Sequence, residues 1–195
     1  MKKLIFATIT VFSFFCSAFA QTAQETFFIN GCLGAGTFSA GDDYGGSVFL
    51  GGSISTDWIP NEEKRLSYGF ETGLLGGNKL GDIIFGVPMI FRFGWHPVFL
   101  KFSNVDMFIL GKAGWAVGIW GQNPNEGSTS NNGVVCGFNF GGRYKLTQST
   151  GIYTEIGYNY YGLARNRDYP EYPLGYGSGK TYASIGISHQ IKWKN

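Results

Sequence analysis

The sequence predicts an all-β fold: a closed, antiparallel, up-and-down transmembrane β-barrel of eight strands. The first observation is composition, because charged residues make up only 14% of the 195 residues, while aromatic residues make up 17%. A typical soluble domain has about 25% charged residues. The second observation is a recurrent alternation of apolar and polar residues, interrupted by turn-forming clusters. The net charge is +2, and two lysines near the start account for it, which excludes a nucleic-acid partner.

Residues 1–20 have the pattern of a cleaved secretory signal. Two lysines precede an uncharged apolar run, and Ala18 and Ala20 are the small residues that a signal peptidase recognises. The alternative, a membrane-spanning helix, needs about 20 apolar residues, and this run is shorter. We therefore expect cleavage after Ala20 and a mature barrel domain over residues 21–195.

Eight segments alternate with a period of two and are long enough to cross a bilayer, which takes about 9–11 residues in a tilted strand. In one of them Phe138 and Tyr144 share an apolar face, while Asn139 and Arg143 lie on the other. The expected strands are residues 26–39, 47–58, 66–76, 83–95, 105–120, 133–146, 150–163 and 180–193. The connections between them have turn and loop compositions: 40–43, 60–63, 77–79, the segment near 96–97, 122–132, 147–149 and 164–179.

The bulky faces of these strands are expected to point outward. Eight strands enclose space for a filling of side chains, and glycine, serine, asparagine and a few charged residues suit that space better than rows of phenylalanine and isoleucine. An outward apolar face on an exported protein implies lipid, where a closed barrel satisfies all backbone hydrogen bonds. With both termini in the periplasm, the long connections 122–132 and 164–179 are extracellular and 147–149 is a periplasmic turn. A soluble carrier of lipocalin type, with its apolar face inward, is the structural alternative.

Four tryptophans fall near the expected strand ends. Three are at the periplasmic ends and one is near the opposite rim: Trp58, Trp95, Trp193 and Trp120. This placement predicts the aromatic girdles of membrane interfaces. The alternative is that they are ordinary core aromatics.

These features resemble the small outer-membrane β-barrels of Gram-negative bacteria, the OmpA/OmpX-like and PorT-like group, over nearly all of the mature chain. Residues 86–92 and 108–114 are similar to barrels of Bacteroidota. The last segment, Ser184-x-Gly186-x-x-His189-x-Ile191-x-Trp193, resembles the signal read by the barrel-assembly machinery. It departs from that pattern at His189 and in the two residues after the last aromatic. The resemblance implies an outer-membrane location, surrounding lipid, and insertion by that machinery.

The sequence contains no pattern that predicts catalysis or a cofactor. No G-x-S-x-G nucleophile motif occurs, and Ser188 and His189 are adjacent, so they point to opposite faces of a strand. Cys32 is expected inside the barrel and Cys136 on the lipid face, which argues against a disulfide and offers no metal-ligand spacing. We therefore expect a protein that is not an enzyme, with no metal and no cofactor.

One set of charged residues is expected to meet inside the barrel. Its members lie on the polar faces of five consecutive expected strands: Glu71, Arg92, Lys112, Arg143 and Glu155. Because unpaired charges there would be costly, they should form a hydrogen-bonded ionic network, with Asp106, Asp57, water or a backbone carbonyl offsetting the third basic group. This network is a proton or ion path in one interpretation and structural filling in the other, which we favour.

The connection 164–179 is rich in tyrosine and proline. Tyr169, Tyr172 and Tyr176 lie close to two arginines, and Tyr and Arg are enriched at binding hot spots. The loop is either a contact surface for an envelope protein or glycan, or an ordered cap over the barrel mouth. The expected role is envelope structure or surface contact. The alternatives are a barrel subunit of a secretion or assembly complex and, less favoured, a lipid-modifying barrel enzyme.

Overall fold

The computed structural model describes residues 26–39, 47–61, 65–79, 82–97, 101–102, 104–121, 128–161 and 178–192. Eight long antiparallel strands form a barrel: β1 (Thr26–Ser39), β2 (Ser47–Asn61), β3 (Leu66–Lys79), β4 (Asp82–Trp95), β6 (Val105–Gly121), β7 (Ser128–Lys145), β8 (Thr150–Tyr161) and β9 (Ser178–Lys192). The predicted signal segment 1–20, Trp193 and the tyrosines of the last loop lie outside the described residues.

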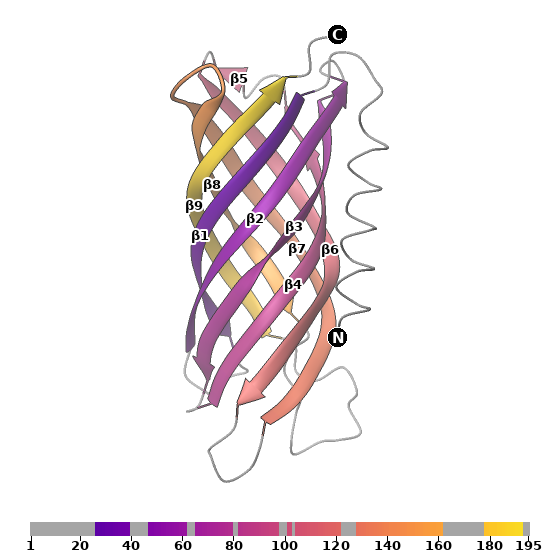
Figure 1. The fold of residues 1–195 in the computed structure, drawn as a ribbon, viewed down its shortest axis with the longest axis vertical. Helices are drawn as coiled ribbons and strands as arrows, with labels where there is room; N and C mark the ends of the chain where they lie inside the picture. Colours follow the sequence, from indigo (N-terminus) through magenta and orange to yellow (C-terminus); the bar gives the residue numbers. More distant parts are fainter. Residues whose placement is uncertain are drawn as a thin grey trace.

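The barrel is closed by two strand pairings. Strands that follow one another in sequence lie side by side, and β1 pairs with β9 along its whole length. A β4–β6 pairing completes the ring (Figure 1). The two-residue β5 (Lys101–Phe102) forms a small hairpin with the beginning of β6 instead of adding to the ring. The predicted closed antiparallel barrel of eight strands is therefore confirmed.

The two ends of the barrel differ in their connections. One end, which we call the termini end, holds the start of β1, the end of β9 and the connections 62–65, 96–104 and 146–149. The other, the loop end, holds the connections 40–46, 80–81, 122–127 and 162–177. At the termini end, the turn after β7 is tied down by bonds from the Leu146 and Thr147 amides to the Thr150 carbonyl oxygen, both 2.9 Å long.

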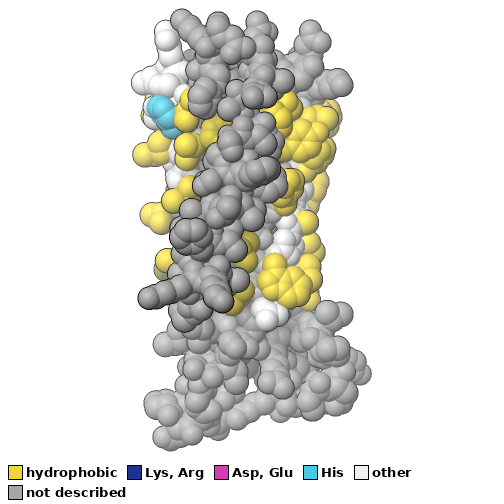
Figure 2. Space-filling model, turned by 45° about the vertical axis from the view of Figure 1, so that its right-hand side comes forward, with side chains coloured by type: hydrophobic (Ala, Val, Ile, Leu, Met, Phe, Trp, Pro, Cys, Tyr) yellow, Lys and Arg dark blue, Asp and Glu magenta, His cyan; other side chains and the backbone are white. Residues whose placement is uncertain are grey.

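The outward faces of the strands are apolar. Phe138 and Ile185, near the middles of β7 and β9, are 65% and 61% exposed, whereas their sequence neighbours are less exposed. Figure 2 displays hydrophobic side chains between the two ends of the barrel, with no Lys, Arg, Asp or Glu colour on the described surface of that face. The outward orientation of the bulky residues is therefore confirmed. Among the described residues, no helix has the length and apolarity needed to cross a membrane.

The interior differs from the expectation of small and polar filling. Large apolar side chains also point inward and are buried, at positions that the sequence pattern placed on the minor faces: Phe28, Phe49, Leu75, Ile90, Phe108, Leu110, Tyr153, Tyr161 and Tyr182. Neighbouring glycines make room for them. A Cβ atom on Gly141 would lie 2.6 Å from Cζ of Phe108 and 2.7 Å from the Thr154 carbonyl oxygen. Small inward residues therefore lie beside large ones in the described lumen.

Strands β3, β7 and β9 are each at least two residues longer at the loop end than the sequence predicted. β3 ends at Lys79 and not at residue 76, so the predicted connection 77–79 lies within the strand. β7 begins at Ser128 and not at residue 133, and its first residues pair with Val117–Gly121 of β6. β9 begins at Ser178, which pairs with Tyr161. Serine and asparagine in these stretches have loop-like composition, yet backbone pairing beyond the apolar band needs no apolar side chains. The connection predicted as 122–132 is shorter for this reason, whereas the connection predicted as 164–179 begins and ends two residues earlier, because β8 ends at Tyr161.

Candidate functional site

The five charged residues singled out in the sequence meet inside the barrel. They come from β3, β4, β6, β7 and β8, and each is at most 5% exposed: Glu71, Arg92, Lys112, Arg143 and Glu155. The alternation of each strand turns its charged residue toward the lumen, and the pairing register brings the five to neighbouring heights. We refer to them, together with the residues that they bind, as the interior network.

Arg92 is the centre of the interior network. Its Nη1 lies 2.5 Å from Oε2 of Glu71 and 3.3 Å from Oε2 of Glu155. Its Nε donates to Oδ1 of Asp57 at 3.0 Å, and its Nη2 donates to the hydroxyl of Tyr153 at 2.6 Å. One guanidinium therefore connects three carboxylates from three strands, which a fork of five N–H groups permits.

Lys112 links the same two glutamates from the other side. Its Nζ lies 2.8 Å from Oε2 of Glu71 and also pairs with Oε1 of Glu155. The Glu155 carboxylate additionally accepts hydrogen bonds from the Tyr153 hydroxyl and the Asn139 amide. Both glutamates are thus held by two cations each, which is the condition under which buried carboxylates remain tolerable.

Arg143 extends the network toward the termini end. Its guanidinium pairs with Asp57 and lies 3.5 Å from Oδ2 of Asp106. It is also enclosed by aromatic rings, with Cζ 4.2 Å from the ring centre of Phe28 and 4.7 Å from that of Phe108. Cation–π contacts of this kind stabilise a guanidinium that has been removed from water.

The described charges of the interior network are balanced. Four cations pair with four carboxylates: Arg65, Arg92, Lys112 and Arg143 with Asp57, Glu71, Asp106 and Glu155. The sequence indicated three basic and two acidic residues and named the two aspartates as possible partners for the remainder. Both aspartates are in the network, and Arg65, which the sequence reasoning missed, supplies the fourth cation.

A second group that the sequence reasoning missed closes the network at the termini end. His96 is fully buried, and its Nδ1 lies 2.9 Å from Oδ2 of Asp106 while its Nε2 lies 3.1 Å from Oγ of Ser67. Arg65 Nη2 donates to Oδ1 of Asp106 at 2.6 Å, and the His96 amide donates to the Arg65 carbonyl oxygen at 2.8 Å. We call Arg65, Ser67, His96 and Asp106 the clasp.

One signal in the sequence could have found His96. It continues the inward parity of β4, two residues after Gly94 and four after Arg92, although it follows the last strand residue. For Arg65 there was no such signal, because it lies in a turn and has a positive φ of 51°. Backbone conformations of that kind do not follow from alternation.

The order of groups in the clasp is that of a serine nucleophile, a histidine base and an orienting acid. The surroundings do not suit catalysis. Ser67 is 1% exposed, and a Cβ on Gly94 would overlap its Oγ, so the β4 backbone lies directly over the hydroxyl. Asp106 is also bound by two arginines. The clasp therefore joins β3, β4 and β6 at the barrel mouth and leaves no space for a substrate at Ser67.

We predict that replacing His96 with Ala lowers the free energy of unfolding by about 1–3 kcal/mol, because it leaves buried polar groups on Ser67 and Asp106 without their partner. The measurement is urea unfolding of the protein refolded in detergent micelles. His189→Ala is the matched control, since His189 is exposed and its described contact is a 3.3 Å approach to Thr150. That variant should change stability by less than about 0.5 kcal/mol, and equal effects of the two substitutions would contradict the clasp.

The loop half of the lumen is mainly apolar, with Asn159 as a buried polar residue. A cluster of buried side chains fills it: Phe49, Leu75, Ile90, Ala116, Val135, Tyr161 and Tyr182. The Phe49 ring packs on Tyr182 at 6.1 Å between ring centres and on Tyr161 at 6.3 Å. The polar network lies on the side of the termini end, and this cluster lies on the side of the loop end.

The predicted girdle residues take several positions. Trp58 and Trp95 lie near the termini end, where Trp58 packs against Tyr68 at 6.3 Å between ring centres. Trp120 lies in β6, one residue before its loop end, and Trp193 is outside the described residues. The two described cysteines are free, with Cys32 buried in the lumen and Cys136 exposed on the outer face. Among the described residues there is no group of His, Cys, Asp and Glu that could hold a metal ion.

Comparison with known proteins identifies relatives of the fold only. No protein-family model and no curated protein sequence matches the chain. Among solved structures, Neisserial surface protein A is similar with a TM-score of 0.62 and 11% identity over 86% of this chain and 97% of its own.

Two further solved structures are similar. A major outer membrane protein from Thermus thermophilus has a TM-score of 0.54 and 12% identity over 85% of this chain and 99% of its own. Ail, the attachment invasion locus protein of Yersinia pestis, has a TM-score of 0.52 and 9% identity over 88% of this chain and 100% of its own. The resemblance stated from the sequence is thus confirmed at the level of architecture: this chain has the fold of the small eight-stranded outer-membrane β-barrels.

Proposed function

We propose that this chain is an integral outer-membrane protein without enzymatic activity, whose filled barrel anchors the loop-end connections at the cell surface. The observation that carries the proposal is the filling of the lumen. The buried side chains of the interior network and of the apolar cluster of the loop half support a plugged interior. A barrel that is occupied in this way supports a structural or contact role rather than diffusion of solutes.

The outer face supports residence in a membrane. Exposed large apolar side chains occur on every long strand, and aromatic residues lie near the termini end, as at membrane interfaces. The secretory signal predicted at 1–20 agrees with export. Insertion by the barrel-assembly machinery is part of the proposal, on the alternation of β9 and its resemblance to the signal that this machinery reads.

Fractionation and conductance test this proposal together. The native protein should sediment with outer membranes, resist extraction by mild detergent, and migrate differently on gels before and after boiling, as a folded barrel does. In planar bilayers the purified protein should give no stable conductance steps. Recovery of the folded protein in the soluble periplasmic fraction would contradict the membrane location, and regular conductance steps would contradict the filled lumen.

Surface contact through the last outer loop is the finer part of the proposal. Tyr169, Tyr172 and Tyr176 lie outside the described residues, so their role rests on the sequence alone. The Yersinia pestis neighbour is named an attachment invasion locus protein, and a contact role here would be of that general kind. Replacing the three tyrosines with serine should reduce adhesion of whole cells to immobilised glycans or envelope proteins while leaving the amount of folded barrel unchanged.

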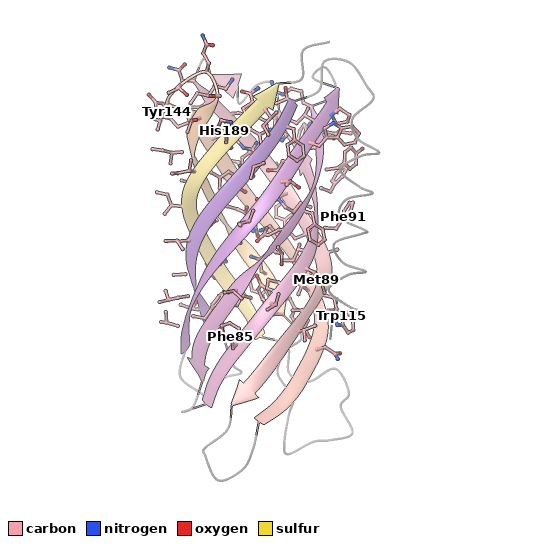
Figure 3. All side chains as sticks on the ribbon, viewed as in Figure 1. Phe85, Met89, Phe91, Trp115, Tyr144 and His189 are labelled. Atoms are coloured by element: carbon pink, nitrogen blue, oxygen red, sulfur yellow. The ribbon has the colours of Figure 1, made fainter. Side chains whose placement is uncertain are left out.

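A second candidate function, a barrel subunit of a larger outer-membrane complex, is favoured by one feature of the outer face. β4 carries large side chains at all heights and not only at its rims: Phe85, Met89, Phe91, Phe93 and Trp95, with Trp115 of β6 beside them (Figure 3). The large apolar residues near the middle of the outward face of β9 are instead aliphatic, namely Ile185 and Ile187. Aromatic residues and methionine are enriched in protein interfaces.

Photo-crosslinking distinguishes this second candidate from a solitary barrel. A photoreactive phenylalanine at position 91, which is 53% exposed, should give a discrete crosslinked protein in native membranes if β4 contacts a partner. The same group at Ile185 is the control, and it should react only with lipid. Lipid adducts alone at both positions would exclude a protein contact on β4.

A further inference from the structure

A small cavity lies inside the barrel mouth at the termini end. Its volume is about 20 Å³, which is enough for a single particle of the size of a water molecule. The turn after β7 forms one side of it, and inward residues of β6, β7 and β9 form the other sides, among them Asp106, Arg143, Lys145 and Ser188. This cavity is separate from the apolar cluster of the loop half and opens next to the exposed side chain of Lys145.

A buried hydroxyl in the cavity has no partner among the described residues. Ser188 is 3% exposed, and its Oγ makes no hydrogen bond within the described part of the chain. An unsatisfied buried hydroxyl is destabilising, and such groups in native proteins are normally paired with protein, water or a ligand. The cavity beside Ser188 is where that partner would lie.

The charges around the cavity indicate which partner is favoured. Arg143 is nearly fully buried. Its guanidinium has five N–H groups, and its described hydrogen bonds use three of them: Nη2 to Asp57, Nη1 to Asp106 at 3.5 Å and Nε to Asn30 at 3.4 Å. Lys145 pairs with no described carboxylate, and it is not among the four cations that balance the four carboxylates of the interior network. It therefore adds one positive charge at the mouth.

The carboxylate that lines the cavity does not cancel this excess. Asp106 has Oδ1 bound to Arg65 at 2.6 Å and Oδ2 bound to His96 at 2.9 Å, with Arg143 at 3.5 Å. Its charge is thus already offset within the clasp and the interior network. Four other residues that line the cavity carry O–H or N–H donors, namely Ser188, Arg143, Lys145 and Gln190, and the rest of the lining is Phe28 and residues 147–151.

From this arrangement we propose that the cavity is a binding site for a small monovalent anion of halide size, which enters from the side of the termini end. The anion accepts hydrogen bonds from Ser188 and Arg143 and neutralises Lys145. The anion connects the turn after β7 to the interior network. That turn is also bonded to β9, because the Gln190 amide donates to the Ser149 carbonyl oxygen at 2.6 Å. The inference goes beyond the proposed function and does not depend on the role of the outer loops.

Chloride binding to the refolded full-length mature chain tests the proposal. With chloride as the probe, the ³⁵Cl resonance should broaden in the presence of the folded protein in zwitterionic detergent micelles. The broadening should be lost in Ser188→Ala and reduced several-fold in Lys145→Gln. Ser184→Ala, which removes an inward-facing hydroxyl of β9 outside the cavity, is the matched control and should broaden the resonance as the unmodified protein does.

Thermal unfolding gives an independent readout. At constant ionic strength, replacing gluconate by chloride should raise the melting temperature by about 2–4 °C, the shift that about 1 kcal/mol produces in a domain of this size. The rise should be smaller in Lys145→Gln, a substitution at an exposed position, and should vanish in Ser188→Ala. Equal melting temperatures in the two salts, or undiminished broadening in Ser188→Ala, would overturn the proposal and assign the cavity to a water molecule.

Discussion

Replacing Arg92 with Met should lower the free energy of unfolding by about 3–5 kcal/mol, or prevent refolding altogether. The substitution keeps an unbranched side chain of similar length but removes the guanidinium that joins Asp57, Glu71 and Glu155. Lys112 and Arg143 would remain to hold these three carboxylates, and a buried carboxylate that loses a partner is destabilised more than the original pair was stabilised. Urea unfolding in micelles, followed by gel mobility without boiling, measures the change.

Two companion variants make the Arg92 result specific. Arg92→Lys retains the charge but not the fork, so it should recover only part of the loss, because an ammonium is a compact charge that cannot span three partners in the same plane. Arg92→Met combined with Glu71→Gln removes one cation and one carboxylate, and it should be more stable than Arg92→Met alone. If Arg92→Met alone lowers the free energy of unfolding by less than about 1 kcal/mol, the interior network does not hold the barrel together.

Replacing Ile185 with Arg should lower the free energy of unfolding in lipid by about 2–4 kcal/mol, the cost of a basic side chain at the bilayer midplane on the lipid face of a barrel. Ile185 lies midway along β9 and is strongly exposed. The reason is that the outer face meets hydrocarbon, where a guanidinium loses its water. Folding into vesicles of defined lipid, measured by tryptophan fluorescence in urea, gives the number.

The control for Ile185→Arg introduces the same residue at a different depth in the membrane. Ile191→Arg lies on the same strand and the same face but one residue before the end of β9, where the penalty should fall to about 0–1 kcal/mol. In a soluble carrier with its apolar face inward, Ile185 would not face lipid, so a larger loss of stability at position 185 than at position 191 would not follow from depth in a membrane. Equal, small effects of both substitutions would contradict burial of this face in a membrane.

Alternation predicted the fold because every long strand has one lumenal and one outer face, and register follows from that parity. Alternation was sufficient to predict that Glu71, Arg92 and Glu155 meet in the lumen, because the period-two pattern places each of them on the lumenal face of its strand. It did not distinguish a polar filling from a mixed one. Inward aromatics such as Phe108 and Tyr153 are compatible with a narrow barrel only because glycine stands opposite, as Gly141 does opposite Phe108, and cross-strand partners are not visible in a single strand.

The clasp was missed for a different physical reason. Arg65 and His96 lie in connections, where backbone conformation depends on turn geometry and hydrogen bonds that a period-two pattern does not encode. Ser67 and Asp106 are each the second residue of a strand whose start was predicted correctly, and Asp106 was named as a possible partner, but their contacts in the clasp depend on Arg65 and His96. Sequence reasoning therefore found the centre of the network better than its edge.

The long sequence separation within the interior network has a consequence for how the protein reaches its native state. Arg143 contacts Asp57 and Asn30, which are 86 and 113 positions away, and Arg92 contacts Glu155 across 63 positions. Such contacts cannot form in a nascent hairpin, and chains dominated by distant pairings acquire them late and slowly. Until the first and last strands zip together, these ions would face hydrocarbon unneutralised, so entry into the bilayer and closure of the ring should occur as a single cooperative event.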